Sequence, residues 1–286
     1  MKQPRILVIQ DISASCRISM NVAVPILSCL GNWVNVLPTA LLSTHTGKEF
    51  EKYTFLDLSA ENLAILEHWR SLNIKFDGIV IGYLGTLQQI ELMQKVIKEF
   101  TTEEALVVLD PVMGDEGQLY DGYTQQHVQA MRELCSYADV LIPNITEACL
   151  LTGRPYLTKP HQKDEVEELI KQLQQLTDKE IILSGVMLNE ASVGAAIVSK
   201  TNAVKIQYTF APVYPGHFDG TGDLFTSTVA GFLFQQQSLL RAAQVAVNYV
   251  SKVVEQTIQE GIDPLYGVVF EKELFYLMQQ LREGTD

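Results

Sequence analysis

The sequence predicts a single-domain α/β fold in which helices cover both faces of a mostly parallel β-sheet. Short apolar, β-branched runs such as residues 6–9 and 105–109 are typical of strands that are buried on both faces. Segments of helical periodicity separate these runs, and such alternation implies crossover connections between parallel strands. Because no linker, repeat or low-complexity tract interrupts residues 1–286, we expect one domain.

Composition narrows the class of protein. The 286 residues are 47% hydrophobic and 19% charged, as in a globular protein with a sizeable core. A formal net charge of −13 argues against nucleic acid or an anionic membrane as the main partner, but not against a phosphate-bearing ligand. The four cysteines are scattered, and the first apolar run, of about five residues before Gln10, is too short for a signal peptide or a membrane span. We therefore expect a cytoplasmic protein with reduced thiols.

The expected strands follow from the apolar runs. They cover residues 6–9, 34–42, 77–81, 105–109, 140–142 and 181–183, with an antiparallel pair at 194–199 and 204–210 and an irregular segment at 48–58. We expect the first of them to end at Gln10 and Asp11, and the strand at 181–183 to stop at Ser184 and Gly185, because glycine interrupts strands.

The expected helices lie between these strands. They cover residues 16–30, 63–72, the segment ending near 100, 125–135, 163–176, 239–257 and 270–282, and one more begins near Thr221. Pro25 is expected to kink the first helix or to mark a boundary in it, because proline lacks the N–H that an inner turn requires.

The stretch from Gly216 to Asp223 is the most informative part of the chain. It precedes a helix whose apolar face is formed by Leu224, Phe225, Thr228, Val229 and Phe232. The glycines allow a sharp turn, and the free N–H groups of a helix N-terminus bind anions such as phosphate. A carboxylate beside a phosphate site suits a general base, which is one reading of Asp223. The alternative is that Asp223 only favours the helix dipole and that the glycines only form a turn.

Polar residues also follow the expected strands, and parallel strands present their carboxyl ends at one edge of a sheet. These residues are Asp11, His45 with Thr46, Tyr83, Asp110 with Asp115, Asn144 with Glu147, Ser184, and the glycine loop itself. Seven such groups at one edge predict a binding site.

Each group also has a structural reading. Asp110 and Asp115 either bind Mg²⁺ or are only solvent-facing acids of a turn. Residues 115–122 either cover a bound nucleotide or form an ordinary surface turn. Asn144 and Glu147 have the spacing of a helix capping box. His45 and Thr46 hydrogen-bond a substrate or cap a turn, and Tyr83 stacks on a ring or is half-buried. Zinc spacing, a phosphate-binding P-loop and a dinucleotide fingerprint are absent from the sequence.

Several motifs together resemble the pyridoxal kinases of the ribokinase-like superfamily, over essentially the whole chain. These motifs are Ile9-Gln10, Ser43-Thr44-His45-Thr46, Gly82-Tyr83-Leu84-Gly85, Asp110-Pro111-Val112-Met113-Gly114-Asp115, Pro143-Asn144 with Glu147, and Gly220-Thr221-Gly222-Asp223. The last motif is shared by sugar, nucleoside and vitamin kinases, whereas the others indicate the vitamin B6 branch. The resemblance implies a ribokinase-like three-layer sandwich and ATP-dependent phosphorylation of the 5′-hydroxymethyl group of pyridoxal, pyridoxine or pyridoxamine.

The resemblance also implies roles for individual residues. Asp223 would be the base, with an anion hole at Gly220, Thr221 and Gly222. The B6 vitamer would be bound by Asp11, His45, Thr46, Tyr83 and Asp223. ATP would be bound by Asp110, Asp115, Tyr120, Asn144, Glu147, Ser184 and Thr221. Mg²⁺ would be bound by Asp110, Asp115 and Glu147. Members of the family are generally homodimers and often use K⁺ as well as Mg²⁺.

Two features depart from the family pattern. Asp11 stands where the family usually has serine, so the preferred vitamer is open, and we expect a shift toward pyridoxamine. The cover loop is also shorter than in some relatives, which leaves its nucleotide contacts open. The alternatives are a kinase for hydroxymethylpyrimidine or another small molecule, and a B6-binding protein without catalysis.

Overall fold

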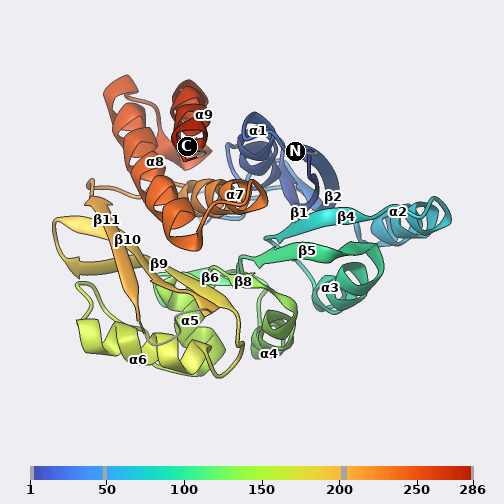
Figure 1. The fold of residues 1–286 in the computed structure, drawn as a ribbon, viewed down its shortest axis with the longest axis horizontal. Coiled ribbons are helices and arrows are strands. Elements are labelled where there is room, and N and C mark those ends of the chain that lie inside the picture. Colours follow the sequence, from blue (N-terminus) through green and yellow to red (C-terminus); the bar gives the residue numbers. More distant parts are fainter. Residues whose placement is uncertain (1–2, 48–49, 201–204, 285–286) are drawn as a thin grey trace.

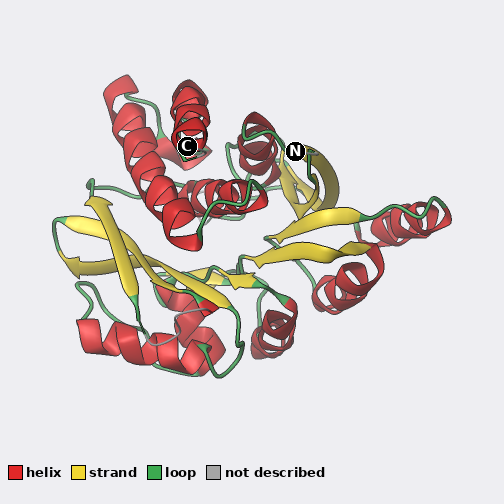
Figure 2. Ribbon diagram, in the orientation of Figure 1, coloured by secondary structure: helices red, strands yellow, loops and turns green. Residues whose placement is uncertain are grey.

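The computed structural model describes residues 3–47, 50–200 and 205–284, and over these residues it confirms the predicted fold class. Its main sheet has nine strands in the order β11-β10-β9-β8-β5-β4-β1-β2-β3. The pairs from β9 through β2 are parallel, whereas β10, β11 and β3 join the sheet antiparallel. Helices cover both faces of the sheet (Figures 1 and 2). None of the described helices is long and apolar enough to span a membrane.

The strands of the main sheet are β1 (Arg5–Ser13), β2 (Trp33–Leu42), β3 (Phe55–Asp57), β4 (Phe76–Ile81), β5 (Thr101–Leu109), β8 (Val140–Leu141), β9 (Glu180–Asn189), β10 (Ser192–Val198) and β11 (Gln207–Pro212). A separate two-stranded sheet pairs β6 (Gly114–Asp115) with β7 (Gln118–Leu119). Residue 204, where the last predicted strand begins, lies outside the described residues, as do residues 48 and 49 of the irregular segment.

Each face of the sheet has its own core. One core packs the sheet against α2 (Ser59–Ser71), α3 (Leu87–Phe100), α4 (Gln125–Leu134), α5 (Ile145–Thr152) and α6 (Lys163–Leu173). The other core packs it against α1 (Met20–Cys29), α7 (Thr221–Phe234), α8 (Leu239–Glu260) and α9 (Leu274–Glu283). The predicted apolar face of α7 is buried in the second core, as its periodicity indicated. The carboxyl ends of the parallel strands stay uncovered by either helical layer, and the site lies there.

The prediction for the first helix was wrong at its start. Helix α1 begins at Met20 rather than near residue 16, with Ser19 as its N-cap, and Pro25 lies inside the helix. Residues before Ser19 are held in a loop, because the side chain of Asn21 donates to the carbonyls of Ser13 and Cys16. This loop lies against the N-terminal end of α7. The loop and this helix end both belong to the site described below.

Two strands continue past the residues at which the sequence predicts their ends. Strand β1 continues past Asp11 to Ser13, and β9 continues past Gly185 to Asn189. Gly185 has φ +71°, and the pairing with β10 skips it, since Ser184 faces Ala195 and Val186 faces Gly194. Gly185 is therefore the extra residue of a β-bulge, for which a left-handed glycine is well suited. The glycine bends the strand instead of ending it.

Candidate active site

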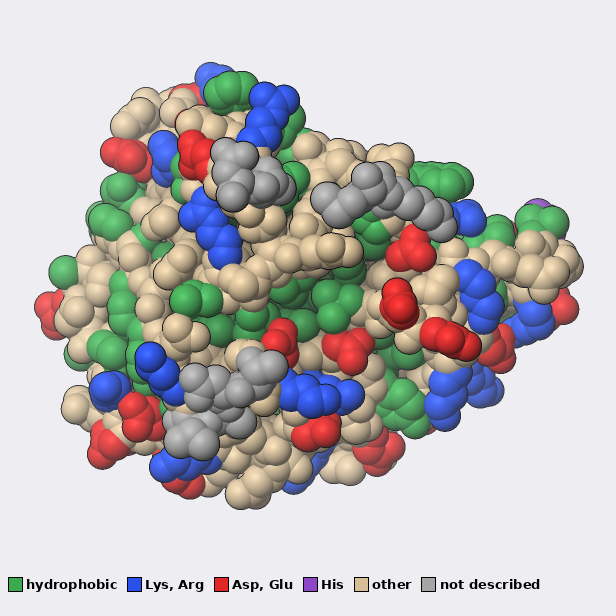
Figure 3. Space-filling view, in the orientation of Figure 1, with side chains coloured by type: hydrophobic (Ala, Val, Ile, Leu, Met, Phe, Trp, Pro, Cys, Tyr) green, Lys and Arg blue, Asp and Glu red, His purple; other side chains and the backbone are tan. Residues whose placement is uncertain are grey.

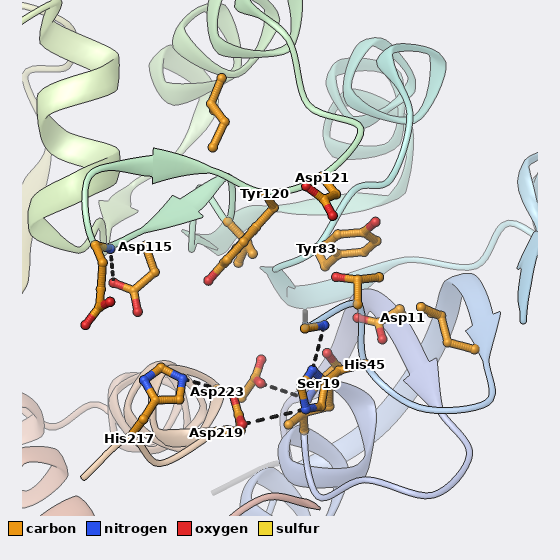
Figure 4. Close-up of a pocket in the computed structure, with 18 of the residues that line it drawn as sticks. Asp11, Ser19, His45, Tyr83, Asp115, Tyr120, Asp121, His217, Asp219 and Asp223 are labelled. Atoms are coloured by element: carbon orange, nitrogen blue, oxygen red, sulfur yellow. Dashed lines mark hydrogen bonds and ion pairs between the residues drawn. The ribbon is translucent and has the colours of Figure 1, made fainter. Parts of the chain in front are cut away.

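Several of the predicted strand-end residues converge on a pocket of about 450 Å³ (Figure 4). Its lining residues are Asp11, Ile18, Ser19, Leu42, His45, Thr46, Gly47, Tyr83, Val112, Asp115, Glu116, Gln118, Leu119, Tyr120, Asp121, His217, Asp219, Gly220 and Asp223. Of the residues predicted from sequence, Asp11, His45, Thr46, Tyr83, Asp115, Tyr120, Gly220 and Asp223 therefore share one pocket.

Asp223 lies in the first turn of α7, where the N–H groups have no partners within the helix. Its Oδ2 atom accepts a hydrogen bond from the backbone N–H of Ser19 at 2.8 Å. Burial raises the pKa of Asp223 to about 7, the charges of Asp11 and Asp110 add to this rise, and the Ser19 N–H opposes it. A carboxylate with a pKa near neutrality is well matched to proton abstraction at physiological pH.

Gly220 is the N-cap of α7 and has φ +81°. A Cβ atom at this position would lie 2.4 Å from the carbonyl oxygen of Arg17, so only glycine fits both the backbone conformation and the contact. At Gly222 a Cβ atom would meet nothing within 4 Å. The helix N-terminus is thus packed against the loop before α1 on one side and open on the other, which is the geometry of an anion site.

Asp11 is buried within β1 at a point where the strand register changes. Gln10 pairs with Pro38 and Ile12 pairs with Leu41, so β2 carries an extra residue opposite Asp11. Bulges of this kind re-aim side chains next to binding sites. Burial raises the pKa of Asp11, while hydrogen bonds from the Ser19 and Ser13 side chains oppose the rise. Ser19 therefore contacts both acids, Asp11 through its side chain and Asp223 through its backbone.

Tyr83 and Tyr120 supply aromatic surface to the pocket. The half-buried Tyr83 packs edge-on against Tyr123, with ring centroids 6.0 Å apart. The Tyr120 side chain lies across the pocket from His217 and Asp219 (Figure 4). Burial raises the pKa of both phenols, so each hydroxyl stays protonated and can donate a hydrogen bond.

His45 lines the pocket, but both of its ring nitrogens already have protein partners. Its Nδ1 atom accepts from the N–H of Gly47 at 2.9 Å, which places the ring proton on Nε2. The Nε2 atom donates to the carbonyl of Leu265 at 2.9 Å and lies 3.6 Å from Asp219 Oδ2. His45 therefore forms a fixed wall of the pocket.

Residues 114–119 form a β-hairpin. Glu116 (φ 47°) and Gly117 (φ 81°) both have positive φ, as a two-residue type I′ turn requires. The Gly117 N–H donates to Thr146 Oγ1 at 2.9 Å, and Asn144 Nδ2 donates to the carbonyl of Gly114 at 2.9 Å. The hairpin, which carries Asp115, is thus attached to the start of α5.

Asp110 and Glu147 form a pair of acids that does not line the pocket. Thr226 Oγ1 donates to Asp110 Oδ2 at 2.6 Å, and burial raises the pKa of Asp110 to about 7. Glu147 accepts from the N–H groups of Met113 and Asn144, at 3.1 and 2.8 Å. Burial first, and then the charge of Asp110, raise the pKa of Glu147 well above its usual range.

The capping-box reading of Asn144 and Glu147 is confirmed, because each side chain accepts from the other residue's backbone N–H. Four further predicted site residues lie outside the pocket lining: Asn144, Ser184, Thr221 and Gly222. Ser184 Oγ donates to the carbonyl of Pro143 at 3.3 Å, and Thr221 Oγ1 donates to that of Phe218 at 3.0 Å. Their roles toward a nucleotide stay predictions.

Residues that the sequence reasoning did not single out complete the site: Ser19, Glu116, Asp121, His217 and Asp219. Ser19 carried a usable signal, because serine before an apolar run is typical of a helix N-cap. His217 and Asp219 lie just before Gly220 in the chain. The Nε2 atom of His217 and the Oδ1 atom of Asp219 are 3.3 Å apart. This ion pair is oriented by the loop, which sequence spacing alone does not define.

Charge in the pocket is strongly unbalanced. Six of the nineteen lining residues are Asp or Glu, two are His, and none is Lys or Arg. Over residues 3–47, 50–200 and 205–284, however, no three His, Cys, Asp or Glu side chains are grouped closely enough to hold a metal ion by themselves. Elsewhere, Lys and Arg alternate with Asp and Glu over the face shown in Figure 3.

Comparisons with known proteins agree with this site and fold. A family-wide sequence profile described as phosphomethylpyrimidine kinase matches residues 56–265. Pyridoxal kinase of Arabidopsis thaliana is 25% identical over 272 residues, which are 91% of this chain and 85% of that protein. The crystal structure of pyridoxal kinase from Lactobacillus plantarum is 32% identical, with a TM-score of 0.89 over 98% of both chains.

A further structure bears on the pocket. The crystal structure, with pyridoxal, of a Bacteroides thetaiotaomicron protein is 34% identical to this chain, with a TM-score of 0.90 over 96% of both chains. The profile covers residues 56–265 of the 286, and the structural matches extend over nearly the whole chain. The chain therefore belongs to the phosphomethylpyrimidine kinase family, in the ribokinase-like superfamily that its motifs resemble.

Proposed function

We propose that this protein is a pyridoxal kinase, which transfers the γ-phosphate of ATP to the 5′-hydroxymethyl group of a B6 vitamer. The observation that carries the proposal is the position of Asp223. Its carboxylate lies at the open N-terminus of α7 and in the same pocket as Tyr83 and Asp11. A base, an anion site and a ring-sized pocket thus adjoin one another, as phosphoryl transfer to a small alcohol requires.

The comparisons support the substrate class. The Arabidopsis and Lactobacillus relatives are named pyridoxal kinases, and the Bacteroides structure was obtained with pyridoxal. The family description names phosphomethylpyrimidine instead, so a hydroxymethylpyrimidine kinase is the second candidate.

Phosphoryl transfer depends mainly on positioning and on stabilisation of charge. In the proposed mechanism, the backbone N–H groups of Gly220, Thr221 and Gly222 bind the phosphate that is transferred. Asp223 accepts the proton of the attacking hydroxyl, and the Ser19 N–H fixes the orientation of its carboxylate. Tyr83 and Asp11 hold the vitamer ring, so that its hydroxymethyl group faces Asp223.

Mg²⁺ suits the acids around the nucleotide end of this site. Asp110 and Glu147 are two partly or fully buried carboxylates that repel one another, and a hard cation would relieve that repulsion. Asp115 adds a third carboxylate from the hairpin. Mg²⁺ typically reaches protein carboxylates through water and binds phosphate directly, so three close side chains are not required. When bound, the cation would neutralise phosphate charge; K⁺, which the family resemblance implies, belongs to the same proposal.

The proposal is tested by ATP-dependent turnover with pyridoxal, pyridoxine, pyridoxamine and hydroxymethylpyrimidine, with Mg²⁺ and K⁺ present. We expect turnover of at least one B6 vitamer, and a fall in kcat of at least about 100-fold in Asp223→Asn, because general-base catalysis contributes about 10²–10⁴-fold. Turnover of hydroxymethylpyrimidine alone would refute the pyridoxal kinase proposal and support a hydroxymethylpyrimidine kinase. Tight vitamer binding without any turnover would indicate a binding protein, and near-normal kcat in Asp223→Asn would refute the assigned base.

A further inference from the structure

Among the residues that the structure describes, no Lys or Arg side chain lines the pocket. ATP nevertheless brings several negative charges into a space lined by six acids. Arg17 is the basic residue beside Gly220, but its Nε atom donates to Glu271 at 2.8 Å. Among the described residues that line the pocket, the two histidines are the side chains that can carry a positive charge.

His45 does not supply this charge. Its Nδ1 atom accepts the Gly47 N–H and its Nε2 atom donates to Leu265, as described above. Both ring nitrogens are thus engaged by backbone groups, and neither is left to contact a phosphate.

His217 has the opposite environment. It lies three residues before Gly220, its side chain is 65% exposed, and its Nε2 atom is paired with Asp219 Oδ1 at 3.3 Å. The ring reaches the space between the α7 N-terminus and the hairpin that carries Asp115 (Figure 4). Three acids face it: Asp219 from its own loop, and Asp115 and Glu116 from the hairpin. The hydrogen bond with Asp219, and then the charges of all three, raise the pKa of His217 to about 9.

We propose that the His217 imidazolium is the protein's cationic ligand for the terminal phosphate of ATP, with Asp219 holding it above the N-terminus of α7. The Nε2–H is directed to Asp219, so Nδ1–H is the donor that faces the phosphate. This inference rests on the proposed kinase function and names one more residue that contacts its nucleotide.

Binding measurements isolate this role from turnover. Dissociation constants for MgATP and MgADP are determined by calorimetry, without vitamer, for the wild type, His217→Gln and His217→Lys. A charge-assisted hydrogen bond to phosphate is lost in the glutamine variant, so we expect its Kd for MgATP to rise about tenfold. The Kd for MgADP, which lacks the terminal phosphate, should change less than about twofold, and His217→Lys should stay within about threefold for both.

The matched control is His68→Gln, the same substitution at an exposed position of α2, and it should leave both constants unchanged. An unchanged Kd for MgATP in His217→Gln would overturn the inference. Equal losses for MgATP and MgADP, or equal losses in the glutamine and lysine variants, would overturn it as well. Failure of the proposed function would show separately, as a wild type that binds nucleotide but phosphorylates no vitamer.

Discussion

At the scale of single residues, the ionisation of Asp223 sets the expected pH dependence. The base acts when deprotonated, and burial raises its pKa to about 7. Activity should therefore be highest above pH 7, and kcat/KM should fall about tenfold per pH unit below it. A pH–rate profile with each of the three vitamers checks this, since an enzyme group gives the same acid limb with all of them. A flat profile between pH 5.5 and 8 would contradict the assignment.

Asp11 is the residue at which this chain departs from its family pattern, and its burial makes the departure consequential. A buried carboxylate is stabilised by a cationic partner, and the amine of pyridoxamine is such a partner. We expect Asp11→Ser to lower the ratio of kcat/KM for pyridoxamine over pyridoxal by about 10- to 150-fold, the range of one charged hydrogen bond. The ratio is measured for both proteins under identical conditions. If the substitution leaves it unchanged, Asp11 does not select the vitamer.

At the scale of elements, the glycine loop offers a matched pair of substitutions. Gly220→Ala places a Cβ atom 2.4 Å from the Arg17 carbonyl oxygen in a backbone with φ +81°, whereas Gly222→Ala points into open space. We expect Gly220→Ala to lower the free energy of unfolding by about 1–3 kcal/mol. Gly222→Ala should change it by less than about 0.5 kcal/mol. Denaturant unfolding measures the free energy of unfolding of both variants. Equal free energies of unfolding would contradict the prediction and mean that the contact with Arg17 is not tight.

The elements themselves followed largely from apolar periodicity, because a strand or helix that buries one face needs a matching pattern. The errors arose where a local signal has two physical meanings. Gly185 was expected to end a strand and instead forms a bulge, since a left-handed residue serves either purpose. The first helix was expected to begin near residue 16, yet Cys16 and Ile18 are buried in the loop that supports Asp223.

At the scale of the whole molecule, the convergence of strand ends on one pocket was predictable, because parallel strands fix which ends meet. The sequence could not separate residues that line the pocket from those that support it. Asn144 is an example: its amide nitrogen holds the hairpin and its amide oxygen caps α5. Such distinctions depend on side-chain direction. For the same reason no individual role was predicted for His217 and Asp219, although they lie within the Gly216–Asp223 stretch.

The expected homodimer also belongs to this scale. Large apolar side chains are exposed along the sheet edge formed by β2 and β3, including Trp33 (54%), Leu41 (42%) and Leu56 (57%). If this edge pairs two copies, Leu56→Asp should weaken dimerisation at least about tenfold, because a charge would be buried without a partner. Sedimentation velocity measures the effect. The control is Leu72→Asp, because Leu72 is equally exposed at 56% but lies at the C-cap of α2. If neither substitution dissociates the dimer, the interface lies elsewhere.

The attachment of the 114–119 hairpin to α5 has a consequence for the cost of binding. Its type I′ turn and its hydrogen bonds to Thr146 and Asn144 already define its conformation in the absence of ligand. A loop that becomes ordered on binding spends part of the interaction energy on lost conformational entropy. In this protein the hairpin loses that entropy when the chain folds. Contacts between the hairpin and a nucleotide therefore contribute to affinity without a further entropic cost of ordering the loop.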